Sequence, residues 1–272
     1  MNHKRRYRWI ISSCVLILFI GLSYIVVFLP YRGAQVIQDE DLLKEHQILF
    51  IGNSYTSSNN FPQIFTKLAQ DGGYDVSALM ITDGGWTLSN HSQSIASDDR
   101  IQQQSWTYVV LQEQSIIPSN PKVREQNMYP AIRLLNEEIK KLGADVVLFM
   151  TWGRRDGLPE SGYNDFFEMQ TELEKGYLKI ANELNVMVSP VGIAWQNALE
   201  KNTQLILWQE DGSHPNINGS YLAACVFYAV IFRESPEGLT YMAGLQDNLG
   251  HFLQSVAADT VIDDLERWNI ER

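Results

Sequence analysis

Two short motifs, far apart in the chain, hold the residue types needed to activate a serine. An apolar run over residues 48–52 ends in Gly52-Asn53-Ser54, and near the other end of the chain Asp211 lies three residues before His214. A serine hydroxyl attacks poorly at neutral pH unless a neutral imidazole accepts its proton and a carboxylate holds that imidazole in the right tautomer. Ser54, His214 and Asp211 could fill these roles, so the two motifs indicate nucleophilic catalysis by serine.

These residues also have simpler interpretations. Asn53 and Ser54 favour turns and helix N-caps, because their side chains bond to nearby backbone groups. Asp211 and His214 could bind a metal, but no second His or carboxylate cluster recurs at ligand spacing, so we expect neither a metal nor another cofactor. No segment reads Gly-x-Ser-x-Gly, which disfavours the α/β-hydrolase fold. Among the five histidines, His91 is the one rival to His214, either as a substrate contact or as an ordinary helix or loop residue.

The elements that must position these residues alternate along the chain. Runs such as 109–111 and 146–150 are apolar on both faces, as in strands covered by helices on both sides. The alternation predicts a three-layer α/β/α domain with a parallel, flavodoxin-like sheet, whose site lies at the carboxyl ends of its strands. Ser54, Gln112, Trp152 and Gly192 follow such ends. Strands are predicted at 47–52, 75–81, 107–112, 145–151 and 186–191, and helices near 62–70, 88–103, 124–142, 163–184, 217–232 and 246–268.

The first 32 residues differ from the rest. Four basic residues within 1–8 precede an uncharged apolar run, 9–29, which is long enough to cross a bilayer as a helix. The basic flank favours a cytoplasmic N-terminus and therefore a domain outside the cytoplasm. A cleaved signal peptide is the alternative, although residues 30–34 offer no clear small-x-small cleavage site. The predicted organisation is a basic stub and anchor (1–32), a polar stem (33–45) and one catalytic domain (46–272).

Charge and cysteine content narrow the possible partners. The formal net charge is −11, and residues 33–272 carry 16 basic against 32 acidic side chains, which disfavours a nucleic-acid partner. Of the two cysteines, Cys14 lies in the apolar run and Cys225 in the domain, so the domain can form no internal disulfide. An extracytoplasmic domain without disulfides suggests a bacterial protein. The sequence predicts no oligomeric state.

The two motifs resemble a known superfamily. Residues 52–56 are similar to the first block of the SGNH (GDSL-type) hydrolases, with Asn53 where many members have Asp, and residues 211–214 are similar to its last block, Asp-x-x-His. The resemblance spans nearly the whole domain. It is closest to a poorly characterised bacterial subgroup, whose blocks read like residues 111–115 and 207–215 here. It implies the SGNH hydrolase fold and ester hydrolysis through an acyl-serine.

Ester hydrolysis also needs hydrogen-bond donors for the developing oxyanion. The backbone N–H of Ser54 is one candidate. A second lies in the turn at 83–85, where the family uses a glycine, and we favour Gly85 over Gly84. The family's third block, Gly-x-Asn-Asp, is replaced here by residues 112–115, Gln-Glu-Gln-Ser. Aligning the strand ends places Gln114 at the Asn position; Gln112 is the alternative, and a hole with two donors only is also open.

The substrate is less defined than the reaction. Trp152 and Arg154 follow the fourth predicted strand, and an aromatic ring beside an arginine suits a sugar-like substrate, although both types also pack and pair structurally. Asn53, Gln112 and His91 are further candidates for substrate contact. We expect an esterase that removes small acyl groups, such as acetyl, from carbohydrates outside the cytoplasm. An O-acyltransferase, a lipase or lysophospholipase, and a non-catalytic glycan-binding module remain alternatives.

Overall fold

A computed structural model describes residues 45–271 of the protein. The predicted basic stub, the predicted anchor at 9–29 and the predicted stem up to residue 44 lie outside the described residues. Within 45–271, no helix is both long enough and apolar enough to cross a membrane.

Five parallel strands form one sheet, in the order β2-β1-β3-β4-β5. All five strands were predicted within a few residues of their observed ends. β5 is the shortest, because the chain turns into a helix soon after it. The strands are β1 (His46–Gly52), β2 (Val76–Thr82), β3 (Tyr108–Leu111), β4 (Asp145–Phe149) and β5 (Met187–Ser189).

Helices alternate with the strands along the chain. They differ from the prediction in two places, at residues 88–103 and at α8. The single helix expected at 88–103 is two helices, because the side chain of Ser94 caps a second helix that begins at Ile95. Helix α8 was not predicted, since the expected strand 186–191 covered its start. The α-helices are α1 (Ser54–Ser57), α2 (Phe61–Asp71), α3 (Leu88–His91), α4 (Ile95–Gln102), α5 (Pro121–Val123), α6 (Tyr129–Lys141), α7 (Phe166–Leu184), α8 (Val191–Lys201), α9 (Ile217–Phe232) and α10 (Asp247–Val261). Short 3₁₀ or π segments are η2 (Ser58–Asn60), η3 (Arg124–Met128), η4 (Pro159–Ser161) and η5 (Ile262–Trp268).

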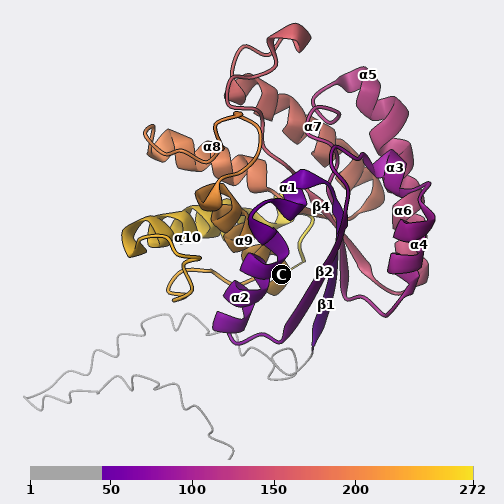
Figure 1. The fold of residues 1–272 in the computed structure, drawn as a ribbon, viewed down its shortest axis with the longest axis horizontal. Coiled ribbons are helices and arrows are strands. Elements are labelled where there is room, and N and C mark those ends of the chain that lie inside the picture. The colour runs from indigo at the N-terminus through magenta and orange to yellow at the C-terminus, as the bar shows by residue number, and fades with distance from the viewer. Residues whose placement is uncertain (1–44, 272) are drawn as a thin grey trace, which may run out of the picture. The chain divides into compact units, whose positions relative to one another are not determined.

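The helices make the three-layer architecture that the apolar strands require. Figure 1 shows α2, α8, α9 and α10 on one face of the sheet and α3, α4, α6 and α7 on the other. Residues 48–51 of β1 are completely buried, as expected for a strand covered on both sides. Phe50 packs edge-on against Phe61 of α2 and Phe227 of α9, which joins that helical layer to the sheet. The predicted α/β/α sandwich with a flavodoxin-like parallel sheet is confirmed.

The strand order places a crevice beside the first motif. β1 lies between β2 and β3, so the connections leaving β1 and β2 run in opposite directions across the sheet. In doubly wound sheets such a reversal opens a crevice at the carboxyl ends of the two central strands. Ser54 follows β1, and Gln112 to Gln114 follow β3, at that edge.

Candidate active site

The turn after β1 presents Ser54 at the start of a short helix. Asn53 is the N-cap of α1, because its side-chain oxygen accepts a hydrogen bond of 3.1 Å from the backbone N–H of Tyr55. Its side-chain amide donates to the carbonyl of Trp86 over 2.8 Å. Asn53 borders the cavity at Ser54 but is only 2% exposed. It therefore fixes the serine turn and ties it to the loop that carries Gly85, which leaves it little surface for the predicted substrate contact.

Ser54, His214 and Asp211 form one hydrogen-bonded line. Nε2 of His214 lies 2.8 Å from Oγ of Ser54, and Nδ1 of His214 lies 2.5 Å from Oδ2 of Asp211. The carboxylate can only accept, so Nδ1 carries the proton and Nε2 is left free to accept one from the serine. This is the geometry that the sequence predicts for nucleophile, base and orienting acid.

Asp211 also organises the loop that holds the histidine. Its second oxygen, Oδ1, accepts hydrogen bonds of 2.9 Å from the backbone N–H groups of Ser213 and His214. Partial burial raises the pKa of the Asp211 carboxyl, but the hydrogen bonds from His214 and from these two N–H groups outweigh it and lower the pKa overall. The carboxylate is therefore ionised at neutral pH, as an orienting acid must be.

Stacked aromatic side chains hold the loop that carries His214 in place. The indole N–H of Trp152 donates to the carbonyl of Ser213 over 3.0 Å, and the hydroxyl of Tyr55 lies 2.8 Å from Oγ of Ser213. The Trp152 ring lies between those of Tyr55 and Trp195, at centroid distances of 4.7 and 4.2 Å and nearly parallel to both. Trp152 is 1% exposed. The expectation that it offers a face to a sugar is therefore wrong, because both faces are already covered.

Gln112 and His91 are likewise supports beneath the site. Gln112 is fully buried; its side-chain oxygen accepts from the N–H of Asn53 and the hydroxyl of Thr56, each at 2.9 Å, and its amide donates to the carbonyl of Glu113. Gln112 is fully buried and does not line the cavity at Ser54, so it is available neither to substrate nor to an oxyanion.

His91 is 2% exposed and its Nε2 donates to the carbonyl of Gly52 over 2.8 Å, so its Nδ1 accepts from the Ser97 hydroxyl. Burial lowers the pKa of His91, against the opposing effects of the Gly52 carbonyl and the charge of Asp83, which keeps the ring neutral. His91 holds the end of β1, so the expectation that it contacts substrate is also wrong.

The remaining predicted donors border the reactive serine. A cavity of about 220 Å³ is lined by Asn53, Ser54, Tyr55, Gly85, Gln114, Ser115, Arg154, Ser213 and His214. Gly85 has φ +73°, which favours glycine, and an added Cβ there would meet nothing within 4 Å. Within residues 45–271, neither the N–H of Ser54 nor that of Gly85 has a hydrogen-bond acceptor. Gln114 accepts from the N–H of Ile116 through its oxygen, which leaves its amide N–H groups for a ligand. Their oxyanion role remains a prediction.

One buried acid, Glu113, joins the loop that carries Gly85 to the loop that carries Gln114. Oε1 of Glu113 accepts hydrogen bonds from the N–H of Leu88, just beyond the Gly85 turn, and from the N–H of Gln114. The side chain is fully buried, and this burial raises the pKa of Glu113 to about 7, although the two N–H groups act in the opposite direction. Glu113 therefore has a structural role: its two hydrogen bonds set the spacing of the loops that carry Gly85 and Gln114.

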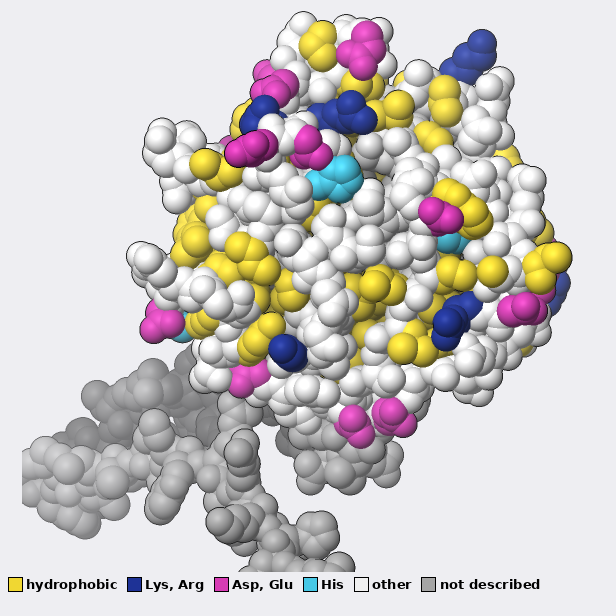
Figure 2. All heavy atoms as spheres, viewed as in Figure 1, with side chains coloured by type: hydrophobic (Ala, Val, Ile, Leu, Met, Phe, Trp, Pro, Cys, Tyr) yellow, Lys and Arg dark blue, Asp and Glu magenta, His cyan; other side chains and the backbone are white. Residues whose placement is uncertain are grey.

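Arg154 is the one predicted substrate contact that lines the cavity as a charged group. No Asp or Glu is among the cavity's lining residues. In Figure 2, basic, acidic and histidine side chains lie close together near the upper edge of the face drawn. Tyr55 and Ser213 are site residues that the sequence reading missed; the position of Tyr55, directly after the proposed nucleophile, was the available signal.

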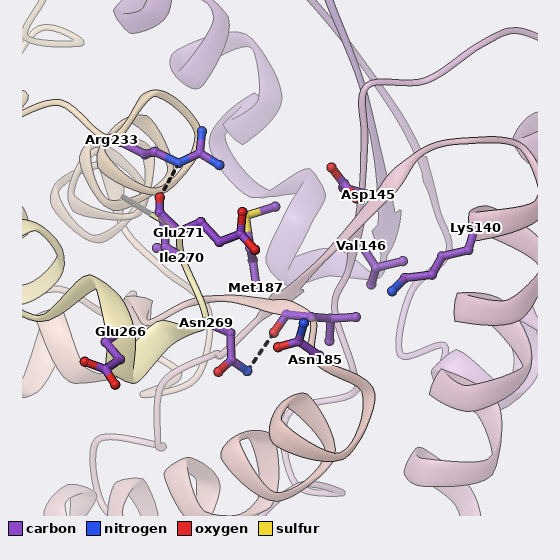
Figure 3. Close-up of a pocket in the computed structure, with 11 residues that line it drawn as sticks. Lys140, Asp145, Val146, Asn185, Met187, Arg233, Glu266, Asn269, Ile270 and Glu271 are labelled. Atoms are coloured by element: carbon purple, nitrogen blue, oxygen red, sulfur yellow. Dashed lines mark hydrogen bonds between the residues drawn. The ribbon is translucent and has the colours of Figure 1, made fainter.

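A larger cavity, of about 590 Å³, lies at the amino ends of the strands, opposite to Ser54. It is bordered by the first residues of β4 and β5, Asp145 and Met187, and by the chain's end, where Asn269 donates to the carbonyl of Val186 (Figure 3). None of the predicted site residues lines it. Among the described residues, no three His, Cys, Asp or Glu side chains are grouped so that they could hold a metal ion.

Comparison with known proteins agrees with this architecture. No protein-family model matches the sequence, and no curated protein matches it. Among solved structures, a DUF4886-family protein from Bacteroides uniformis is similar over 80% of this chain and 95% of its own, with 19% identity and a TM-score of 0.70. A proposed SGNH hydrolase from Slackia heliotrinireducens is similar over 68% and 98%, with 24% identity and a TM-score of 0.58. A mutant acetyl-xylooligosaccharide esterase from Geobacillus is similar over 74% and 95%, with 17% identity and a TM-score of 0.53.

At these identities the likeness concerns the fold. The order of the five strands, the helices on both faces and the serine turn after β1 match what the two sequence motifs implied. The described domain therefore has the fold of the SGNH (GDSL-type) hydrolase superfamily.

Proposed function

We propose that the protein is a serine esterase that acts through an acyl-serine intermediate. The observation that carries this proposal is the line from Asp211 through His214 to Ser54, with hydrogen bonds of 2.5 and 2.8 Å, at the border of a cavity. A fold alone would not support a reaction, because one fold hosts many functions. Here the three side chains stand in the relation that proton transfer from serine to histidine requires.

In the proposed reaction, Ser54 attacks the ester carbonyl while its proton passes to Nε2 of His214. The resulting imidazolium is stabilised by the carboxylate of Asp211, which remains ionised. His214 then gives the proton to the departing alcohol, and the acyl group stays on Ser54. Water then attacks the acyl carbon while His214 takes a proton from it. The bond between the acyl carbon and Oγ of Ser54 breaks, His214 returns the proton to that oxygen, and the carboxylic acid leaves.

The oxyanion formed at each step would be held by three groups that border the cavity. The N–H groups of Ser54 and Gly85 lack acceptors in the described part of the chain, and the amide of Gln114 completes the set. Glu113 keeps the second and third of these at a fixed spacing through its bonds to Leu88 and Gln114. Such prearranged donors lower the barrier because they need no reorganisation during the reaction.

The acyl group that fits best is short. The cavity of about 220 Å³ is smaller than the roughly 300–1,000 Å³ of typical small-molecule sites, which favours acetyl over a long acyl chain. The similar Geobacillus structure is named as an acetyl-xylooligosaccharide esterase, which supports a carbohydrate as the alcohol. The basic and apolar residues 1–29 further support a domain held outside the cytoplasm, or secreted after cleavage, where such carbohydrates occur.

The test is hydrolysis of acetyl and octanoyl nitrophenyl esters by the purified full chain, beside Ser54→Ala. We expect hydrolysis of the acetyl ester that is lost in the variant, a lower rate on the octanoyl ester, and an acetyl adduct on Ser54 by mass spectrometry. Equal rates for wild type and Ser54→Ala would remove the acyl-serine mechanism. A preference for the octanoyl ester would favour a lipase, and faster acetyl transfer to an added sugar than to water would favour an acyltransferase.

A further inference from the structure

We propose that Arg154 makes the site selective for anionic substrates: acylated molecules that carry a carboxylate or phosphate close to the ester. This inference rests on the proposed esterase function and adds the charge of the substrate to it. It concerns the binding of substrate and assigns Arg154 no part in proton transfer.

The guanidinium of Arg154 is unusual in this molecule because it lacks a partner. No hydrogen bond or ion pair joins its side chain to any residue between 45 and 271, and its Nε is buried without an acceptor. Every other arginine in that range bonds an oxygen of the protein. These are Arg100, Arg124, Arg133, Arg155, Arg233 and Arg267.

A buried donor without an acceptor is costly, and native structures leave few of them without a reason. Only the backbone of Arg154 is engaged, through an N–H bond to Sδ of Met169. The neighbouring Arg155 shows the alternative: it pairs with Asp156 over 2.9 Å and lies against the loop at Gly212. The chain thus neutralises one arginine of the pair and leaves the other for a ligand.

The surroundings of Arg154 favour an anion in the cavity. It lines the same cavity as Ser54 and His214, and no carboxylate lines it with them. Burial raises the pKa of the Tyr55 phenol, and the charge of Arg154 acts against that rise, which places the guanidinium within electrostatic reach of the residue beside the nucleophile. An acidic chain of net charge −11 repels anions in general, so a lone cation at the serine would select those that enter.

The planar fork of a guanidinium matches carboxylate and phosphate oxygens, which it can bind through two parallel hydrogen bonds. A neutral sugar hydroxyl would satisfy at most part of that fork. The substrate class that follows is an acylated acid, such as an acylated sugar acid or sugar phosphate. The catalytic steps described above are unchanged by this assignment.

The experiment compares esters that differ only in charge, with the full chain as enzyme. Para-acetoxybenzoate is measured against its isosteric neutral amide, para-acetoxybenzamide, and phenyl succinate against phenyl succinamate, so that the charge lies on the alcohol or on the acyl side. Para-acetoxyphenyl phosphate separates phosphate from carboxylate. Each is measured for wild type, Arg154→Met and the matched control Arg155→Met, with the rate of Ser54→Ala subtracted.

We expect wild type to favour the anionic member of at least one pair in kcat/KM by roughly ten- to one-hundred-fold, as a charge-assisted hydrogen bond provides. Arg154→Met should abolish this preference, because the anion loses its charged partner. Its kcat/KM for the neutral esters should stay within about threefold of the wild-type value, because the catalytic groups are untouched. Arg155→Met should alter kcat/KM for the anionic and the neutral esters by the same factor, so that the preference for the anion is kept.

Two results would overturn the proposal. One is a wild-type enzyme that hydrolyses neutral and anionic esters with equal kcat/KM. The other is an Arg154→Met enzyme whose kcat/KM falls to the same degree for the neutral and the anionic esters. A chain that hydrolyses no ester in a Ser54-dependent way would instead refute the esterase function. Ser54→Ala would then be titrated with para-acetoxybenzoate by calorimetry, where binding that depends on Arg154 supports the anion site and its absence refutes it.

Discussion

Replacing Glu113 by Gln should make the protein less sensitive to alkaline pH. Glu113 is fully buried and its carboxyl pKa is raised to about 7 from an ordinary value of 4.5. Between these two values the folded protein keeps a proton that the unfolded chain has released, so the free energy of unfolding falls as pH rises. The loss is complete above a pH of about 7. The amide in the variant does not titrate, and its side-chain oxygen can accept the same two N–H bonds.

The size of the effect follows from the difference between the two pKa values. A shift from 4.5 to about 7 corresponds to about 3 kcal/mol at alkaline pH. Between pH ~5.5 and ~8.5, wild type should lose about 2 kcal/mol of stability that Glu113→Gln does not lose. That difference is a substantial part of the stability of an ordinary domain.

The assay is urea unfolding of wild type and Glu113→Gln, followed by far-UV circular dichroism and tryptophan fluorescence at both pH values. Glu200→Gln is the matched control, because Glu200 lies on the exposed side of α8 and its loss should leave the wild-type pH dependence in place. Coincident transitions by the two probes would justify the use of a two-state free energy. Glu113→Ala should be less stable than Glu113→Gln at both pH values, because it leaves two buried N–H groups without an acceptor.

The reasoning would be refuted by parallel pH profiles for wild type and Glu113→Gln. It would also be refuted by a wild type that becomes more stable from pH ~5.5 to ~8.5 relative to the variant, since that is the sign expected for a lowered carboxyl pKa.

Three further substitutions test separate parts of the site. Asp211→Asn should reduce kcat roughly 10³- to 10⁴-fold with little change in KM, because His214 loses the acceptor that fixes its tautomer; a loss under tenfold would contradict this. Gln114→Ala should lower kcat about 10²- to 10³-fold if its amide serves the oxyanion, whereas an unchanged kcat would leave a hole of two donors. Trp152→Phe removes the bond to the carbonyl of Ser213 and should cost about 1–3 kcal/mol in urea unfolding. If kcat of Trp152→Phe also falls while KM is unchanged, the loop that carries His214 has become less well ordered.

The backbone of this protein was easier to predict from sequence than the direction of its side chains. Strand positions were evident because the runs at 109–111 and 146–149 are apolar on both faces, and the structure buries them on both. The break at 92–94 within the expected helix depends on local capping by Ser94, whose side chain accepts from the backbone N–H of Ser97 and so begins a second helix. α8 was hidden because the apolar residues that begin it continue the pattern of β5.

The site shows the same division. Ser54, Asp211 and His214 could be named because their order and spacing are those of two blocks of one superfamily. Trp152 and Gln112 were misassigned because a strand's end shows where the chain reaches the crevice, and not whether a side chain points into it. In both cases tertiary contacts decided: an aromatic stack covers Trp152, and the serine turn uses the polar groups of Gln112.

The hydrogen bond between Tyr55 and Ser213 joins segments 158 positions apart. Tyr55 lies in α1, directly after the first strand, and Ser213 lies in the loop before α9, so this contact forms only when the early and late segments of the domain have come together. Contacts of such separation close late, because the chain between them must first be ordered. Recovery of esterase activity during refolding would therefore lag behind recovery of secondary structure. The same hydrogen bond links the neighbours in sequence of Ser54 and His214. A fluctuation of either loop would therefore move the nucleophile and its base together.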